Sequence, residues 1–292
     1  MTIEIARGVG PGRIAIAYER LGDPADPPLL LIMGLGAQLV GWPDAFCGAL
    51  VARRFHVIRF DNRDAGESTR FTGIPNFAAA MLGDISTAAY TLSDMAADTA
   101  GLLDVLGIAS AHIVGASLGG FVAQTLAIEH RARVRTLTSI MSSTGARDVG
   151  QPHPASAALF AGAPPVTREQ AIERARRGAQ LIGSTALGID LDGVAERAGR
   201  AFDRGLDPAA FIRQGVAVLA SGDRTPRLRT LDVPALVIHG TADILVDISG
   251  GRATAAAIPG AKLVEIEGMG HDLPHAVWPR LVDEIAALAA RE

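Results

Sequence analysis

The chain has 292 residues, of which 49% are apolar and 20% charged, and it carries a formal net charge of −4. This composition is ordinary for a globular protein, and a single α/β domain can reach this length. The sequence has no basic stripe that would favour a nucleic-acid partner and no apolar run long enough to span a membrane. Its one cysteine, Cys47, excludes an internal disulfide.

The first ten residues contain Glu4 and Arg7 and lack the apolar segment of a signal peptide. We therefore expect a cytoplasmic protein. No sequence feature decides the oligomeric state, so a monomer and a homodimer are both compatible with the chain.

Short apolar segments in the first half of the chain predict strands. Residues 13–19 (RIAIAYE) alternate apolar and polar positions, as a half-buried strand does. Continuous apolar runs follow at 29–33, 56–60 and 111–115, and another strand is predicted at 134–141. Such runs are typical of a mostly parallel sheet with helices on both faces.

Helices are predicted between these strands. Residues 42–53 and 91–106 carry apolar positions at helical spacing. Thr91 and Asp94 form a capping-box pattern at the start of the second helix.

The alternation of strands and helices then stops. Residues 145–228 carry helical patterns alone, and strands return at 235–239 and 262–266, before a last helix at 276–290. The sequence therefore predicts an α/β core and a helical cap inserted into it. The core comprises residues 1–144 and 229–292, and the cap comprises 145–228.

Residues 115–119 (GASLG) fit the G-x-S-x-G pattern of a nucleophile elbow. Glycines are needed there because the serine occupies a sharp turn from strand to helix, with strained backbone. The strand at 111–115 leads into the motif and a helical segment, 121–130, follows it. A glycine-rich turn with an incidental serine is the alternative, but this context favours Ser117 as a nucleophile.

Two backbone N–H groups are candidate donors to a developing oxyanion. That of Leu118 lies at a helix start, where free N–H groups and the helix dipole favour negative charge. The other is expected in the loop after strand 29–33, and we assign it to Leu35. Gly34 and Gly36 flank it and allow a substrate to approach the backbone, although they could also serve only to form a turn.

A nucleophilic serine needs a base and an acid that orients the base, and behind such an elbow these follow in the order acid, histidine. His271 lies in a glycine-rich loop after the last strand, at the sheet edge where Ser117 is expected. Asp243 is the first carboxylate after strand 235–239 and is the preferred acid. Asp247 is the alternative, and Asp243 could also cap its own loop in an Asx-turn.

Together these motifs resemble the esterase and lipase branch of the α/β-hydrolase superfamily, in particular the bacterial carboxylesterase group of aclacinomycin methylesterase. The matching stretches are 22–34, 41–46, 56–68, 90–108, 115–120 and 268–274. The resemblance implies the α/β-hydrolase fold, a Ser117–Asp243–His271 triad, and Leu35 and Leu118 as oxyanion donors.

Residues 145–228 match this group poorly, so the resemblance does not support a methylesterase acting on a polyketide. A serine at the nucleophile position argues against haloalkane dehalogenases and epoxide hydrolases, which have an aspartate there. We therefore expect hydrolysis of a small-molecule carboxylic ester through an acyl-enzyme. No group of side chains has metal-ligand spacing, so neither a metal nor another cofactor is expected.

Features of the expected pocket are less specific. Small apolar residues at 155–163 and 216–220 favour an acyl group of small to medium size, or they simply pack the cap onto the core. Residues 72–89 form a long connection of the kind that lines active sites, which would bring Phe77 and Met81 to the pocket mouth. A lactonase, thioesterase or C–C hydrolase could use the same triad, and a non-catalytic ligand receptor could share the fold.

Overall fold

The computed structural model describes residues 2–292. Its centre is an eight-stranded sheet with the order β1-β2-β4-β3-β5-β6-β7-β8. The strands are β1 (Glu4–Val9), β2 (Ile14–Leu21), β3 (Pro28–Ile32), β4 (His56–Phe60), β5 (Ala111–Ala116), β6 (Val134–Ile140), β7 (Ala235–Gly240) and β8 (Lys262–Ile266). β2 pairs antiparallel with β1 and β4, and the other neighbours are parallel. The expected mostly parallel sheet is confirmed.

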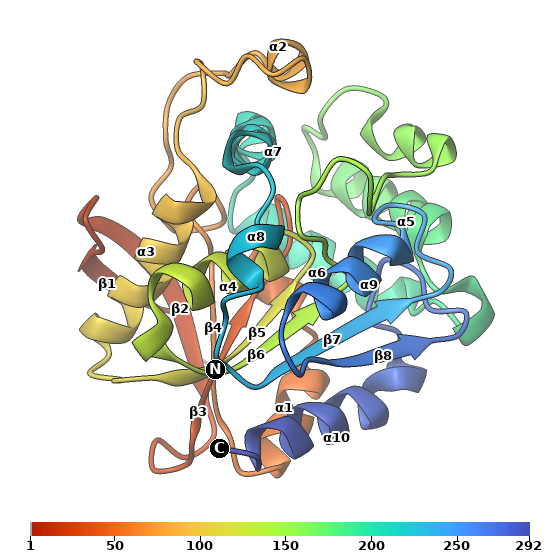
Figure 1. Ribbon diagram of the computed structural model, residues 1–292. Helices are drawn as coiled ribbons and strands as arrows, with labels where there is room; N and C mark the ends of the chain where they lie inside the picture. Colours follow the sequence, from red (N-terminus) through yellow and green to blue (C-terminus); the bar gives the residue numbers. More distant parts are fainter. Residues whose placement is uncertain (1) are drawn as a thin grey trace.

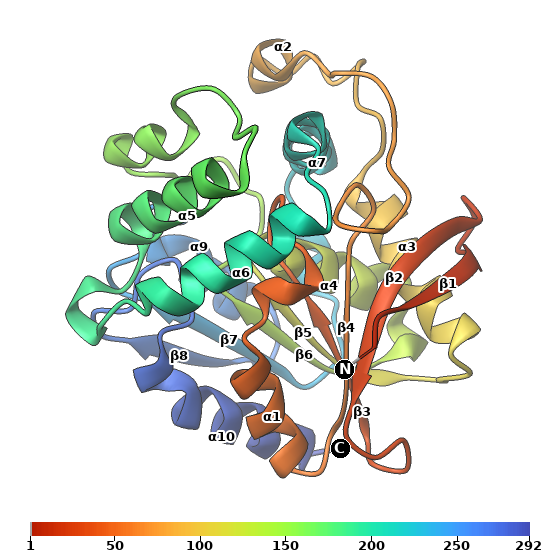
Figure 2. The same ribbon diagram turned by 180° about the vertical axis from the view of Figure 1, so that it is seen from behind.

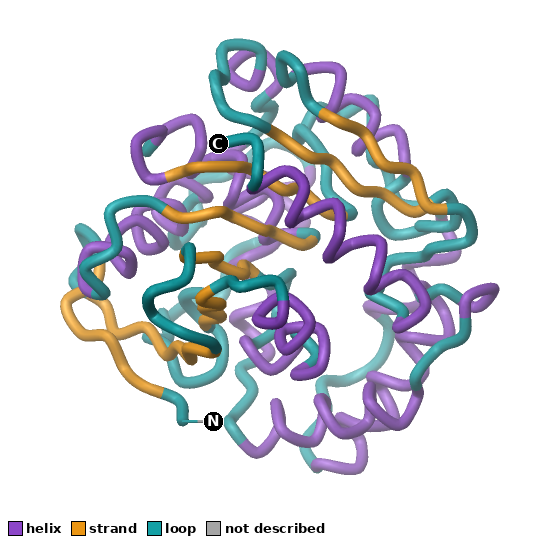
Figure 3. Tube along the Cα trace, turned by 90° about the horizontal axis from the view of Figure 1, so that it is seen from below, coloured by secondary structure: helices purple, strands orange, loops and turns teal. Residues whose placement is uncertain are grey.

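Helices cover both faces of the sheet (Figure 1, Figure 3). One face packs against α1 (Asp44–Ala52) and α10 (Trp278–Ala289), and the other against α3 (Leu92–Val105), α4 (Leu118–Glu129) and α9 (Ile248–Ala257).

β3 shows why its sequence is continuously apolar. Leu30 and Ile32 enter the apolar cluster on the side of α3 and α4. Leu29 and Leu31 enter the cluster that α1 and α10 cover. Because side chains alternate along a strand, both faces of a covered sheet demand apolar residues.

β1 is a strand that the sequence analysis did not predict. Its residues Glu4 to Ala6 pair with Tyr18 to Ile16 of β2, at the edge of the sheet. Only Ala6 and Val9 of the strand are buried. With so few apolar positions, an edge strand of this kind gives a weak periodic signal.

The segment between β6 and β7 contains helices, most of which lie above the sheet edge (Figure 1, Figure 2). They are the helices α5 (Arg168–Ile182), α6 (Leu191–Asp203), α7 (Pro208–Ser221) and α8 (Thr225–Leu228), besides short 3-10 turns. α8 packs against α4 and α9 of the core. The boundaries of a core at 1–144 and 229–292 and a cap at 145–228 stay a prediction.

Buried ion pairs join this helical segment to the loop that follows β4. Arg204 lies 2.6 Å from Asp61, and Arg213 lies 2.8 Å from Asp64. All four side chains are largely or wholly buried. Removing one partner of such a pair is strongly destabilising, because the other charge is left buried alone.

No helix within residues 2–292 is long and apolar enough to cross a membrane.

Candidate active site

Ser117 lies on the turn between β5 and α4, with φ 54° and ψ −120°. A positive φ is unusual for a residue with a side chain and marks local strain. The neighbouring glycines permit the turn. A Cβ on Gly115 would lie 2.0 Å from the carbonyl oxygen of Gly119, and one on Gly119 would lie 1.9 Å from that of Ile32. The strand, turn and helix around Ser117 are thus those expected of the motif.

The structure brings together the three side chains that the sequence analysis grouped as a triad. Nδ1 of His271 donates to Oδ2 of Asp243 over 2.7 Å. Nε2 of His271 then accepts from the Ser117 hydroxyl over 3.0 Å. The three residues come from loops that follow β5, β7 and β8. A serine and a carboxylate on the two nitrogens of one imidazole form the geometry of a nucleophile, its base and an orienting acid.

Asp243 is held from several directions. Its Oδ1 accepts the N–H groups of Leu245 and Val246, both at 2.9 Å, so this side chain also caps its own loop. Burial disfavours the charged carboxylate, but the neighbouring His239 and the hydrogen bond from His271 outweigh this effect and keep the pKa of Asp243 below its usual range. Asp243 is therefore ionised at neutral pH and can orient His271.

The alternative acid, Asp247, is the N-cap residue of α9. Its side chain accepts the N–H of Ser249 and caps the start of α9. The structure thus brings Asp243, and not Asp247, to His271.

Both candidate oxyanion donors have free N–H groups. The backbone nitrogens of Leu35 and Leu118 donate to no other group within residues 2–292. Leu118 is the first residue of α4, where an N–H has no partner in its own helix. The loop with Leu35 adjoins the nucleophile, since a Cβ on Gly34 would lie 3.2 Å from Cβ of Ser117.

The expected mouth residues lie on α2 (Phe77–Met81), above α7 on the side away from the sheet (Figure 1). The Phe77 ring packs on Gly215 of α7, and Met81 is exposed. Among residues 2–292, neither side chain forms a hydrogen bond with Ser117, whose hydroxyl pairs with His271. Their place in a substrate path stays a prediction.

Three side chains that sequence analysis did not single out hold the loops around Ser117. Asn62 Nδ2 donates to the Met33 carbonyl over 3.1 Å. Gln214 of α7 accepts the N–H of Gly36 over 2.8 Å. Ser184, which follows α5, accepts the N–H of Gly270 over 2.8 Å. Only the last two come from the helical segment, and each contacts a loop that carries a candidate catalytic group.

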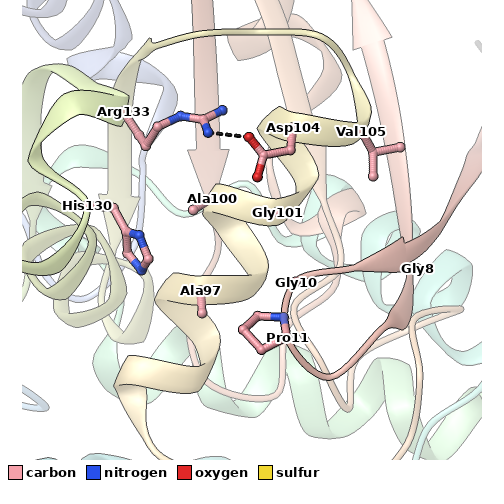
Figure 4. A pocket seen from close by; sticks show the side chains of 10 residues that line it. All are labelled: Gly8, Gly10, Pro11, Ala97, Ala100, Gly101, Asp104, Val105, His130 and Arg133. Atoms are coloured by element: carbon pink, nitrogen blue, oxygen red, sulfur yellow. Dashed lines mark hydrogen bonds and ion pairs between the residues drawn. The ribbon is translucent and has the colours of Figure 1, made fainter.

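Two surface cavities lie away from these loops. One has a volume of about 420 Å³ between α3 and the turn after β1, and the Arg133–Asp104 ion pair lies at its edge (Figure 4). The other, of about 510 Å³, is lined by residues such as Arg63, Phe71 and Tyr90. Neither is lined by Ser117 or His271, so neither defines the space for a substrate at the candidate triad.

The family described as alpha/beta hydrolase fold matches residues 27–275 of the chain. The chain belongs to this family. As an α/β hydrolase it is 34% identical to rhodomycin D methylesterase DnrP of Streptomyces peucetius, and the alignment covers 94% of each protein. It is 32% identical to rhodomycin D methylesterase DauP of Streptomyces sp. strain C5, again over 94% of each. These relationships confirm the expected enzyme class, a carboxylic ester hydrolase.

The same fold is found in the solved structure of an esterase, RhEst1, from Rhodococcus sp. ECU1013. It has a TM-score of 0.75, covers 99% of both chains and is 24% identical, which is a likeness of fold. The alignments with the methylesterases leave only a small part of this α/β hydrolase uncovered. The alignments therefore run through residues 145–228, the segment in which none of the motifs shared with the aclacinomycin methylesterase group lies.

Proposed function

We propose that this α/β hydrolase cleaves carboxylic esters of small to medium apolar acyl groups, with Ser117 as nucleophile, His271 as base and Asp243 as the orienting acid. The observation that carries the proposal is the unbroken hydrogen-bonded sequence from Ser117 to His271 to Asp243, with distances of 3.0 and 2.7 Å. The methylesterase relatives support an ester as the bond that is cleaved.

The proposed reaction has two acyl-transfer steps. Oγ of Ser117 attacks the ester carbonyl while Nε2 of His271 takes its proton, and Asp243 stabilises the imidazolium. The N–H groups of Leu35 and Leu118 donate to the oxyanion, and His271 returns the proton to the leaving alcohol. Water then hydrolyses the acyl-enzyme, with His271 again as base. No metal or other cofactor has a step in this scheme.

Aromatic side chains of the helical segment support an apolar substrate group. A Cβ on Gly36 would lie 2.9 Å from the ring of Phe211, so this ring packs on the loop that carries Leu35. The ring of Phe160 lies 5.7 Å from that of Phe211. Phe211 thus places an apolar ring next to the turn with the proposed oxyanion donor, and Phe160 packs on that ring. The relatives make a methyl ester a specific candidate, with methanol as the leaving group.

A panel of substrates tests the bond that is cleaved. It should contain p-nitrophenyl esters from acetate to octanoate, methyl esters of apolar acids, acyl-thioesters and lactones. We expect turnover of the p-nitrophenyl esters with short and medium acyl chains. A preference for lactones or thioesters would mean that the same triad acts on those substrates in place of simple esters. Complete lack of turnover of short acyl esters would contradict the proposal.

The expected cytoplasmic location stays a prediction, as does the choice between a monomer and a homodimer.

A further inference from the structure

Gln214 lies in the middle of α7 and is fully buried. Both the oxygen and the nitrogen of its side-chain amide form hydrogen bonds. Oε1 accepts the N–H of Gly36 over 2.8 Å, and Nε2 donates to the carbonyl of Arg63 over 2.9 Å. Gln214 therefore joins the helical segment to two loops of the sheet edge at once, the one after β3 and the one after β4.

The bond to Gly36 closes a set of contacts that fix the loop after β3. The N–H of Ala37 donates to the carbonyl of Gly34 over 3.1 Å, which makes residues 34–37 a turn. Gly36 has φ +68°, and a positive φ at the third position of a turn calls for glycine. The preceding carbonyl, that of Met33, accepts from Asn62.

One polar group in the middle of this turn has no partner. The N–H of Leu35 donates to no group of the described chain, while the N–H of Gly36 next to it is taken by Gln214. Glycines on both sides give this backbone much freedom to rotate. The contacts of Gly36 and Met33 therefore decide where the free N–H of Leu35 points.

We propose that Gln214 is a positioning residue for the oxyanion hole. By accepting the N–H of Gly36 it holds the 34–37 turn in the form that leaves the N–H of Leu35 free and directed at the reacting carbonyl. Gln214 itself does not touch the substrate. This inference rests on the proposed function, in which Leu35 and Leu118 donate to the oxyanion.

Gln214→Met tests the inference because it removes the acceptor at nearly constant volume. Gln214→Asn keeps a buried amide, one methylene too short for Gly36, and serves if the methionine variant folds poorly. Gln214→Glu keeps an oxygen that faces Gly36. The matched control is Gln124→Met in α4, whose buried amide donates to Ser139 and accepts from Arg224, both at 3.2 Å, away from the turn.

Each variant is assayed for kcat and KM on a p-nitrophenyl ester and for Ki of a trifluoromethyl ketone. In the inhibitor complex Oγ of Ser117 bonds to the carbonyl carbon, its proton passes to His271, and the former carbonyl oxygen occupies the oxyanion hole. We expect Gln214→Met and Gln214→Asn to lower kcat about 10- to 100-fold with KM within about twofold. Ki should rise in proportion to the fall in kcat/KM.

The remaining variants separate positioning from a general loss of structure. Gln214→Glu should retain more activity than Gln214→Met, and Gln124→Met should keep the wild-type kcat. Wild-type kcat in Gln214→Met and Gln214→Asn would overturn the inference, and so would a lower kcat with an unchanged Ki. A wild-type protein that fails to hydrolyse every ester would refute the proposed function instead, and the inference with it.

Discussion

His239 and Asp243 lie four residues apart, and Nε2 of His239 is 3.5 Å from Oδ2 of Asp243. The same nitrogen donates to the carbonyl of Val246 over 2.8 Å. The carboxylate that accepts a hydrogen bond from His271 therefore also faces a second, fully buried imidazole. His239 is thus a hydrogen-bonded core histidine of β7 that also lies beside the candidate acid.

Replacement of Asp243 by asparagine should lower kcat about 10⁴-fold with a small change in KM. The amide favours the wrong tautomer of His271 and cannot stabilise the imidazolium, as in other serine hydrolases with this arrangement. Steady-state kinetics on a p-nitrophenyl ester measure this effect, with Asp247→Asn as the matched control. Equal losses in the two variants would contradict the assignment of Asp243.

The same substitution should change how stability depends on pH. Because the pKa of Asp243 is lowered in the folded state, its ionised form contributes stability that is fully present above the pKa of the unfolded chain. This contribution is lost as the pH falls toward the folded pKa. The difference in unfolding free energy between wild type and Asp243→Asn should thus be constant above about pH 5 and shrink below about pH 4. Urea denaturation at a series of pH values measures it, and a difference that grows on acidification would contradict the account.

Gly119→Ala should destabilise the fold by about 3 kcal/mol, because overpacking forces the backbone to shift. Its Cβ would lie 1.9 Å from the carbonyl oxygen of Ile32, and backbone atoms cannot yield easily. Gly48→Ala in α1 is the control, since a Cβ there meets nothing within 4 Å. Urea denaturation should show a more stable Gly48→Ala, as expected of glycine replaced in a helix. Equal stability of the two variants would show that the elbow is not constrained as described.

Ser184→Ala should lower kcat about tenfold, because the loop that carries His271 loses its contact with the helical segment. Ser184 accepts the N–H of Gly270, and its hydroxyl and N–H both donate to Asp272, whose pKa is raised by burial. Ser156→Ala is the control, since that buried hydroxyl donates to the carbonyl of His153, in the same segment. Steady-state kinetics measure kcat of both variants, each at a temperature at which the variant is fully folded. A fall in kcat for both variants would indicate a general effect of the helical segment.

Much of the sheet could be predicted from the sequence, because the central strands β3 to β7 are buried on both faces and are therefore rich in apolar residues. β3 is the plainest case, with Leu29 to Ile32 fully buried. β1 was not predicted, since only two of its residues reach the core. Ser117, Asp243 and His271 could be grouped because each lies in the turn or loop that follows a strand, and the carboxyl ends of parallel strands share one edge.

The contacts that hold the site could not be predicted in this way. Gln214 lies 178 residues from Gly36, and Ser184 lies 86 residues from Gly270. Gln214 is one polar residue in a helical pattern, and Ser184 lies in the loop after α5. The partner of each is known only when the helices are placed over the sheet. His239 had a local signal, since it directly precedes the loop that carries Asp243, but a histidine in a strand is more often part of the core.

Labelling by a fluorophosphonate probe reports whether Ser117 is a nucleophile activated by His271. The probe bonds to an activated serine oxygen and releases fluoride, and intact-protein mass spectrometry measures the added mass. We expect one label on the wild-type protein, located at Ser117 by peptide mapping, and no label on a folded Ser117→Ala variant. A wild-type protein that stays unlabelled, or a Ser117→Ala variant that labels as well as the wild type, would contradict the assignment of Ser117 as the nucleophile.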